Sequence, residues 1–417
     1  MFWRTVLQVG PGLVTGASDD DPSGIATYSQ AGAQYGFSVL WMAVFSYPLM
    51  CAVQEISARI GRVTGRGIAA NLLKAYPRPV VVVIVFLVLI SSIFNLGADL
   101  GAMGEATRML VGGARWFHIL WLGIGSLLLQ VFIRYTRYVN YLKWLSLSLL
   151  AYIITVFIVH VPWGEALRRT LAPPIRSFHG DYVTMIVAVL GTTISPYLFF
   201  WQASQEAEEV KDRKEEQPLI RAPEQASEQL WRIKLDTYLG MAASNIVAYF
   251  IMLTAAVTLY AHGDTNVQTA TQAAKTLEPL AGQYAYVLFS LGIIGTGLLA
   301  VPVLAGAAAY AAGEAMRWRV GLEVKFHKVV NFYACLAVAM LIGLSLNFIH
   351  LDPIRALFVA AVINGFLASP IMAMMMLLTR DPKIMGEFRL PGYLRAFGWI
   401  GTAVMGAAAA ALLFQLF

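Results

Sequence analysis

The feature that most constrains this chain is a series of apolar runs, each long enough for a helix that crosses a membrane. About 20 helical residues span a hydrocarbon layer of about 30 Å. Two runs, 6–36 and 181–205, are interrupted in the middle by polar residues and a proline. Nine others are continuous: 38–60, 79–103, 115–133, 138–161, 232–261, 282–312, 327–348, 354–378 and 393–416. The pattern predicts an all-α polytopic membrane protein with eleven transmembrane helices.

Composition agrees with this interpretation and excludes several classes of protein. Of the 417 residues, 58% are hydrophobic and only 13% are charged, whereas soluble domains carry about 25% charged residues. The net charge of +6 does not predict nucleic-acid binding, because the basic residues recur at the ends of apolar runs and form no patch with aromatics. We expect one transmembrane domain over residues 1–417.

The basic residues also predict the orientation in the membrane. Most of the 30 Lys and Arg fall on one side if the N-terminus is cytoplasmic, as the positive-inside rule requires. We therefore expect a multi-pass protein of the cell membrane, with its N-terminus inside and its C-terminus outside. The longest polar stretch, QEAEEVKDRKEEQPLIRAPEQASEQ at 205–229, is predicted to be a solvated cytoplasmic linker.

The first interrupted run contains the densest acidic cluster of the chain, GASDDDPSG at 16–24. About twelve apolar or small residues lie on each side of it, and each set alone is too short to cross. An exposed loop is the alternative, since Asp followed by Pro also begins helices. That alternative leaves two half-length apolar segments without a membrane partner, so we expect one span that is broken at Asp19 to Asp21.

The second interrupted run reads VTMIVAVLGTTISPYLFFWQAS. Its proline lacks an N–H and clashes with the preceding turn, so we expect the helix to open over residues 191–197. The two interrupted runs are the first and the sixth, five spans apart. Broken helices at matching positions of two halves indicate a substrate site near the membrane midplane. We expect a LeuT-type fold with inverted repeats at about 6–162 and 180–378, and an extra helix at 393–416.

The chemistry of the two breaks favours a cation as the transported substrate. Ionised carboxylates at membrane depth require a cation or a water-filled cavity, and neither interrupted stretch contains Lys or Arg. The available ligands are carboxylates, hydroxyls and freed carbonyls, with no Cys, His or Met in either break. Such oxygen ligands suit hard divalent ions such as Mg²⁺ and Mn²⁺.

Three stretches carry a resemblance to a known family. GPGLVTGASDDDPSGIATYSQAGAQYGFSVLW followed by QEISARIGRVTGRG, together with LGTTISPYLFFWQAS, resembles helices one, two and six of the Nramp divalent-metal transporters. The resemblance implies a LeuT fold of eleven or twelve helices and, for most members, Mn²⁺ or Fe²⁺ uptake coupled to protons. It also implies that Asp21 is a metal ligand.

The departures from the family pattern concern the metal and proton sites. The family motif Asp-Pro-Gly-Asn is here Asp21-Pro22-Ser23-Gly24, which lacks the asparagine ligand. Met-Pro-His is here Ser195-Pro196-Tyr197, without the thioether and the histidine tied to proton transfer. The pattern Asp-Leu-Ala-Glu reads Asp99-Leu100-Gly101-Ala102, without the glutamate. These departures resemble the Nramp-related magnesium transporters, a branch said to move Mg²⁺ and Mn²⁺ without proton coupling.

Our hypothesis from the sequence is a facilitator or secondary transporter of Mg²⁺ and Mn²⁺, not an enzyme. Asp21 is the expected principal ligand. The Ser18 and Thr192 carbonyls, the Ser195 hydroxyl and the Asp20 carboxylate complete the predicted site. We expect no cofactor beyond the transported metal, no partner other than the lipid bilayer, and no requirement for an oligomer.

Several alternatives remain open at this stage. One is a proton-coupled Mn²⁺ or Fe²⁺ transporter, and another is a LeuT-fold symporter for organic cations or amino acids. A gated channel shares the same ligands, and saturable uptake would favour a carrier. An intramembrane aspartyl protease needs two aspartates on separate helices, which the single broken helix does not offer. Asp99 in the third span either lines an aqueous vestibule or hydrogen-bonds to a neighbouring helix.

Overall fold

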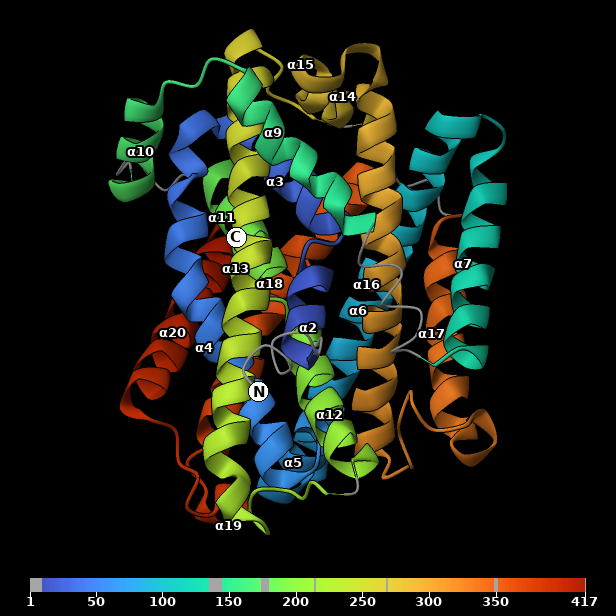
Figure 1. Cartoon of the computed structure of the whole chain (residues 1–417), viewed down its shortest axis with the longest axis vertical. Helices are drawn as coiled ribbons and strands as arrows, with labels where there is room; N and C mark the ends of the chain where they lie inside the picture. Colours follow the sequence, from blue (N-terminus) through green and yellow to red (C-terminus); the bar gives the residue numbers. More distant parts are fainter. Residues whose placement is uncertain are drawn as a thin grey trace.

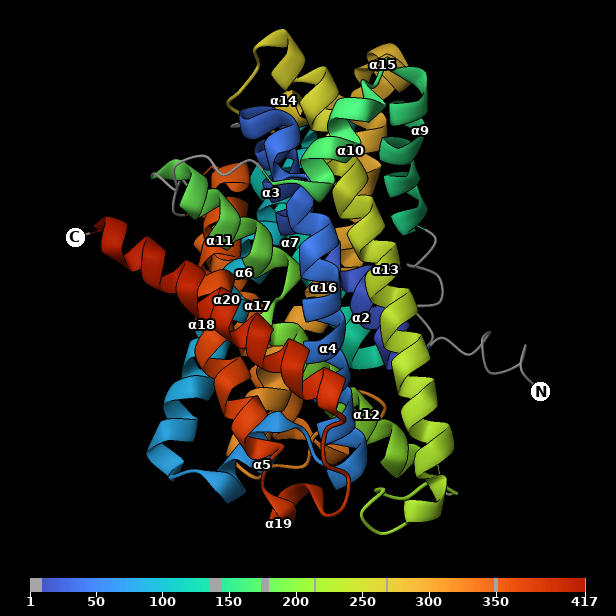
Figure 2. The ribbon, with the colours of Figure 1, turned by 90° about the vertical axis from the view of Figure 1, so that its left-hand side faces the viewer.

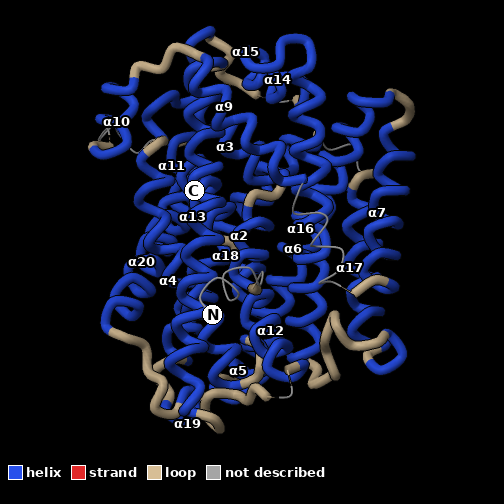
Figure 3. The backbone as a smooth tube through the Cα atoms, viewed as in Figure 1, coloured by secondary structure: helices blue, strands red, loops and turns tan. Residues whose placement is uncertain are grey.

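The computed structural model describes residues 10–134, 145–173, 180–213, 215–267, 269–348 and 352–416, and among these it contains helices and loops without a strand (Figure 3). The first half of the chain forms α2 (Pro11–Asp19), α3 (Pro22–Tyr35), α4 (Trp41–Thr64), α5 (Ile68–Ala75), α6 (Arg78–Val111), α7 (Arg115–Phe132), α9 (Leu150–Ile158) and α10 (Trp163–Leu171). The second half forms α11 (Asp181–Thr193), α12 (Pro196–Asp212), α13 (Ala226–Thr258), α16 (Ala285–Ala315), α17 (Val330–Leu346), α18 (Pro353–Leu378) and α20 (Gly392–Leu416). Short helices α14 (Ala270–Ala274), α15 (Glu278–Ala281) and α19 (Pro382–Met385) lie in connections.

Each predicted apolar run coincides with a helix or a pair of helices in the described residues. Residues 138–144 of the fifth run and 6–9 of the first lie outside the described residues. Within the described ranges, seven helical stretches are long and apolar enough to cross a membrane, and Pro22–Val39 and Trp41–Thr64, joined at a bend of 106°, pass the same test only as a pair. The helices run broadly along the long axis of the molecule (Figures 1 and 2). The repeat boundaries stay a prediction.

The distribution of side chains is that of a membrane protein. Large apolar residues lie on the outside, as Val83 and Phe86 on α6 and Phe157 on α9 illustrate with exposed fractions of 56%, 58% and 71%. Carboxylates lie inside, and Asp21 and Glu206 are almost wholly buried. The exterior therefore matches a hydrocarbon environment, while the carboxylates face the interior of the bundle.

Both predicted breaks are present. The first span is divided into α2 and α3, with Asp20 and Asp21 between them. The sixth span is divided into α11 and α12 at Ile194 and Ser195. The second break is narrower than the predicted opening over 191–197, because α11 stays helical to Thr193 and Pro196 already occupies the first position of α12, where its missing N–H costs no hydrogen bond.

Helix α13 runs alongside both parts of the first broken span (Figure 1). Glycines allow the backbones to approach closely. A Cβ built on Gly16 of α2 would lie only 2.3 Å from the Gly240 carbonyl of α13, and one on Gly32 of α3 would lie 2.2 Å from the Met252 carbonyl. Small residues at such positions are the usual means of tight helix packing in membranes. α13 therefore supports the first span on both sides of its break.

The prediction of a solvated linker over 205–229 is wrong for the first part of this stretch. Its first eight residues are helical and continue α12 to Asp212. Glu206 has no exposed surface and Glu208 is 8% exposed. These glutamates are paired with basic side chains or hydrogen-bonded to neighbouring segments, which the sequence alone did not indicate.

Candidate cation site between two broken helices

Asp21 begins helix α3 and lies at the centre of the candidate site. Its backbone is extended and its Oδ1 atom accepts hydrogen bonds from the Gly24 backbone N–H at 2.8 Å and from the Ser23 hydroxyl at 2.5 Å. Pro22 follows at the first helical position. An Asp cap followed by proline is a favourable helix start, so the local sequence fixes the direction of this carboxylate.

The second oxygen of Asp21 faces two other helices. Its Oδ2 accepts from the Asn95 amide of α6 at 2.9 Å and from the Tyr197 phenol of α12 at 3.0 Å. The residue is 1% exposed, and no basic side chain of the described residues forms an ion pair with it. Four donors from three helices thus hold one buried carboxylate, which stabilises its charged form without a protein cation.

The C-terminal end of α11 is closed by Ser195. Its hydroxyl lies 3.0 Å from the Gly191 carbonyl and 2.9 Å from the Thr192 carbonyl and donates to one of them at a time. Gly191 packs on α18, and a Cβ there would lie 2.1 Å from the Ala361 carbonyl. The Thr192 carbonyl and the Ser195 oxygen are therefore both at the break, where they contact each other rather than Asp21. Their assignment as ligands stays a prediction.

The two breaks meet at Gly24. A Cβ built on Gly24 would lie 3.4 Å from both the Asp19 carbonyl oxygen and the Thr192 hydroxyl oxygen. The Thr192 hydroxyl also lies 3.5 Å from the Ser23 hydroxyl. The end of α2, the start of α3 and the end of α11 are therefore within contact distance of one point. This is the position at which the family carries an asparagine.

Asp19 and Asp20 face a different helix from Asp21. The Ser244 hydroxyl of α13 lies 2.8 Å from Asp19 Oδ2 and 3.1 Å from Asp20 Oδ1. Asp19 Oδ1 and the Ser18 hydroxyl are buried without a hydrogen-bond partner in the described part of the chain. Neither Ser18 nor Asp20 has a hydrogen bond to Asp21 among the described residues. Their assignment as ligands stays a prediction, and Asp20 directs its carboxylate toward α13.

Three partners were missed from the sequence: Asn95, Tyr197 as a direct neighbour of Asp21, and Ser244. Asn95 had a detectable signal, since it interrupts an apolar run one turn before Asp99 and both residues share a helix face. Tyr197 stands where the family has histidine, and only the fold brings its phenol to Asp21. Nothing in the sequence around Ser244 distinguishes it from the many small residues of α13.

The side chains around Asp21 do not by themselves supply enough ligands to complete the coordination of a metal ion. Within the described ranges, no three His, Cys, Asp or Glu residues come together in a way that could hold a metal ion. An ion at Asp21 would be bound by one carboxylate, neutral oxygens and water. The sequence indicated no sulfur near the break, but the Met103 thioether lies in its neighbourhood. A Cβ built on Gly297 would lie 2.4 Å from Met103 Sδ and 3.3 Å from the Pro22 ring. That thioether is not among the hydrogen-bond partners of Asp21.

Asp99 of α6 adds a further buried carboxylate. It has no exposed surface and neither of its oxygens has a hydrogen-bond partner among the described residues. It is close enough to Asp21 for their charges to interact. Of the two predicted roles, a hydrogen bond to a neighbouring helix is therefore not found, and its carboxylate adds to the negative potential near the site.

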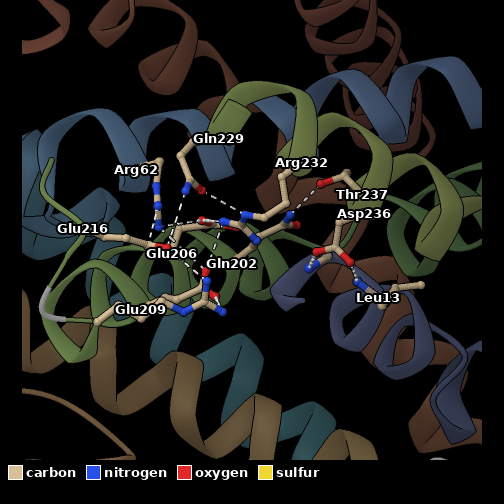
Figure 4. A network of polar contacts seen from close by, with 12 residues as sticks. Leu13, Arg62, Gln202, Glu206, Glu209, Glu216, Gln229, Arg232, Asp236 and Thr237 are labelled. Atoms are coloured by element: carbon tan, nitrogen blue, oxygen red, sulfur yellow. Dashed lines mark hydrogen bonds and ion pairs between the residues drawn. The ribbon is translucent and has the colours of Figure 1, made fainter. Parts of the chain in front are cut away.

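The start of α2 is held by a second polar cluster (Figure 4). The Asp236 carboxylate of α13 accepts from the backbone N–H groups of Gly12 at 2.6 Å and Leu13 at 3.2 Å. These N–H groups have no partner within their own helix, and the positive end of the helix dipole favours a carboxylate there. Asp236 thus joins the N-terminal end of α2 to α13.

Four charged residues near Asp236 complete this cluster (Figure 4). Arg232 of α13 lies 2.7 Å from Glu206 and 3.0 Å from Glu209, both on α12. Arg62 of α4 lies 3.9 Å from Glu206 and 3.8 Å from Glu209. The cluster therefore connects α4, α12 and α13, with α2 attached through Asp236.

Glu216, in the connection after α12, is paired with Arg62 at 2.5 Å and with Arg213 at 3.0 Å. Burial alone would raise the pKa of Glu216, but the hydrogen bonds and charges of Arg62 and Arg213 outweigh it and lower the pKa below the ordinary value of 4.5. The ionised form is therefore favoured in the folded protein. The stability that it contributes is present above pH 4.5 and is lost as the pH falls through the lowered pKa.

Comparison with known proteins identifies the family. The family model described as natural resistance-associated macrophage protein-like, or Nramp, matches residues 12–415. The chain belongs to the Nramp family. It is 26% identical over 407 residues to the divalent metal cation transporter MntH of Klebsiella pneumoniae, with 95% of this chain and 91% of that protein covered. MntH of Erwinia tasmaniensis is 25% identical over 421 residues, with the same coverage.

Solved structures confirm the fold of this Nramp protein. The Eremococcus coleocola manganese transporter, in complex with an aromatic bis-isothiourea substituted compound, superposes with a TM-score of 0.76 at 14% identity, covering 100% of this chain and 87% of that one. Mhp1, a nucleobase-cation-symport-1 family transporter in a closed conformation, superposes with a TM-score of 0.59 at 15% identity, covering 98% of this chain and 93% of that one. The protein is therefore an all-helical, multi-pass membrane protein with a LeuT-type fold, as predicted.

Proposed function

We propose that this Nramp protein transports divalent metal cations by binding them at Asp21, between the breaks of its first and sixth spans. The observation that carries the proposal is the buried Asp21 carboxylate, which contacts three helices and no basic side chain (distances above). A carboxylate at membrane depth is costly and marks an ion pathway. Relatives described as divalent metal cation transporters support the same class of substrate.

Within that class, we infer that Mg²⁺ and Mn²⁺ are the preferred ions. The oxygen and amide groups near Asp21 suit hard cations, and Gly24 and Ser195 leave out the larger ligands of the family pattern. A smaller protein ligand set leaves room for bound water, which Mg²⁺ retains more strongly than Ca²⁺ does. The Asn95 Oδ1 atom, buried and without a partner in the described residues, offers an amide oxygen beside Asp21 in place of the one missing at Gly24.

Two cavities on opposite sides of Asp21 support alternating access. One of about 430 Å³ is lined by Gln30 of α3, Asp181 of α11 and Asp352 at the start of α18. The other, of about 190 Å³, lies between Pro11 of α2 and Gln205 of α12. Because Asp21 is 1% exposed, the ion would be enclosed between them. Following the positive-inside rule, we assign the α5 end of the molecule to the cytoplasm.

The proposed transport does not move protons. The positions of the family histidine and glutamate are Tyr197 and Ala102, and the Tyr197 phenol donates its hydrogen to Asp21. Proton-coupled Mn²⁺ transport is the second candidate. The buried Asp99, without a hydrogen-bond partner in the described chain, favours it, since such a carboxylate could accept a proton.

Uptake by purified protein in liposomes tests the proposed substrates. We expect saturable uptake of Mg²⁺ and Mn²⁺ and much slower uptake of Ca²⁺, which is larger and prefers more oxygen ligands. Protein-free liposomes provide the background. Uptake of none of these ions above background would overturn the proposal, and competition by amino acids or organic cations would favour another type of symporter.

Replacing Asn95 tests its part in ion binding. Asn95→Ala removes a donor to Asp21 and an amide oxygen, so we expect the KM for Mg²⁺ to rise about tenfold, equivalent to about 1.4 kcal/mol. Ser92→Ala is the matched control, because Ser92 lies on the same helix and its buried hydroxyl has no hydrogen-bond partner in the described residues. An equal KM for wild type and Asn95→Ala would show that Asn95 takes no part in binding.

A further inference from the structure

At the α5 end of the molecule, two adjoining cavities each have four basic side chains among the ten residues that line them. One has a volume of about 420 Å³ and the other about 360 Å³. They lie between α5, the C-terminal ends of α12 and α16, and the connections after α4 and α12. Arg66, Lys74 and Lys211 line both, Arg317 lines the larger and Arg221 the smaller.

These basic side chains form no close ion pair in the described part of the chain, although the charge of Lys211 interacts with that of Glu314 at longer range. Among the described residues, none of the five has a carboxylate oxygen within the 4.0 Å that defines an ion pair. Arg62 and Arg232, in the adjacent cluster of Figure 4, each have at least two such partners. The positive-inside rule explains basic residues at this end of the molecule, but not their convergence from several segments on one pair of cavities.

The two carboxylates that line the cavities are already engaged. Glu314 accepts from the Ser204 hydroxyl at 2.8 Å and from the Ala70 N–H at 3.2 Å. Glu216 is paired with Arg62 and Arg213, as described above. With five basic and two acidic side chains, the lining of the two cavities carries a net formal charge of +3.

The backbone at Arg317 is a second, independent observation. Its φ is 59°, and it is the one non-glycine residue with positive φ in the described part of the chain. It is the second residue after α16, following the cap residue Met316, and the Trp318 N–H closes the helix by bonding to the Gly313 carbonyl at 2.7 Å. Glycine is the usual residue in this left-handed position. Residues in strained backbone conformations cluster at functional sites, so the arginine at this position indicates that its side chain has a functional role in the cavity.

The electrostatic environment of Lys74 agrees with a concentrated positive potential. Partial burial of the Lys74 ammonium and repulsion from the nearby Arg66 lower the pKa of Lys74 below its ordinary value. An anion bound between these two side chains would relieve both effects, because it would replace the lost hydration and screen the repulsion.

We propose that these cavities form a binding site for a multiply charged phosphate group. Arginine side chains bind phosphate oxygens through two parallel hydrogen bonds, and lysines add point charge. The larger cavity falls within the size range of ligand sites. A soluble polyphosphate, such as that of a nucleotide, and the headgroup of an anionic lipid share this chemistry.

The site is placed to influence transport, which makes it more than a surface patch. Glu314 lines the larger cavity and joins α5 to α12 through Ala70 and Ser204. Helix α12 begins at the break that contacts the Asp21 region. A phosphate bound beside Glu314 would therefore lie next to a contact of α12, the helix that carries Tyr197. Binding of a cytoplasmic phosphate could in this way change the position of α12 and the rate of transport.

Binding of inorganic pyrophosphate to the full-length protein tests the proposal. Calorimetric titration is done in neutral detergent with EDTA, so that no divalent metal is present. We expect one site whose affinity falls as KCl is raised, and about tenfold weaker binding for both Arg66→Gln and Arg317→Gln. Arg319→Gln is the matched control, because Arg319 is exposed, lies two residues from Arg317 and lines neither cavity.

A lipid arm distinguishes the two sources of phosphate. The same variants are placed in nanodiscs that contain phosphatidic acid in phosphatidylcholine, and bound lipid is counted by native mass spectrometry. Pyrophosphate binding that both variants weaken identifies a soluble ligand. If the wild-type protein retains phosphatidic acid, both variants lose it, and none of them binds pyrophosphate, the ligand is a lipid headgroup. Binding of neither probe, or binding that Arg319→Gln weakens as much as Arg317→Gln, would overturn the site while leaving metal transport untouched.

Discussion

Asp21→Asn is expected to reduce Mg²⁺ and Mn²⁺ uptake about 100-fold or more. The substitution removes the charge of the proposed principal ligand, and an amide NH₂ would also face donors such as Asn95 and Tyr197. A 100-fold loss corresponds to about 2.7 kcal/mol, within the range for a charge-assisted interaction. The measurement is initial uptake in proteoliposomes, normalised to the amount of monodisperse protein.

Asp264→Asn is the control for this prediction. Asp264 is exposed, and its contact with Lys275 at 3.5 Å is on the surface, where such a pair contributes little. Uptake should stay near wild type in this variant. If Asp21→Asn forms folded protein and retains wild-type uptake, Asp21 is not the ligand and the site must be sought elsewhere, for example at Asp19 and Asp20.

Arg62→Leu is expected to destabilise the protein by about 3–5 kcal/mol, the usual cost of removing one partner of a buried ion pair. Arg62 has no exposed surface and contacts three glutamates, of which Glu216 is the nearest at 2.5 Å. Without Arg62, the remaining basic partner among the described residues is Arg232 for Glu206 and the exposed Arg213 for Glu216. The expected result is a large fall in the midpoint of denaturant-induced unfolding in mixed micelles.

Arg213→Leu provides a matched comparison, because Arg213 contacts Glu209 at 2.5 Å and Glu216 at 3.0 Å but its side chain is 42% exposed. Exposed pairs contribute less than about 1 kcal/mol, so this variant should unfold near the wild-type midpoint. Equal effects of the two substitutions would show that burial of Arg62 does not determine the stability of the cluster.

The sequence predicted those features that depend on local pattern. Apolar runs of about 20 residues predicted the spans, and polar residues with proline predicted the breaks at Asp21 and Ser195. Both signals arise within a single helix, where length and the missing proline N–H determine the outcome. The matching positions of the breaks then predicted the LeuT-type fold that the solved structures confirm.

The sequence did not predict contacts between distant segments. Asn95 and Tyr197 meet Asp21 only after α3, α6 and α12 are packed together, and no local pattern encodes that contact. The glutamates of α12 were interpreted as solvated because their partners, Arg62 and Arg232, lie on α4 and α13. Charged residues in a polar stretch are ordinarily exposed, so only the packed structure distinguishes the buried ones.

The measurement that tests the central claim most directly records Mg²⁺ uptake and internal pH in the same proteoliposomes. A dye inside the vesicles reports metal and a second dye reports protons, with and without an imposed pH gradient. We predict saturable Mg²⁺ uptake that depends on Asp21, is unaffected by the gradient and leaves internal pH at the background of Asp21→Asn vesicles. Metal-driven acidification above that background, or the absence of Mg²⁺ and Mn²⁺ uptake, would contradict the account.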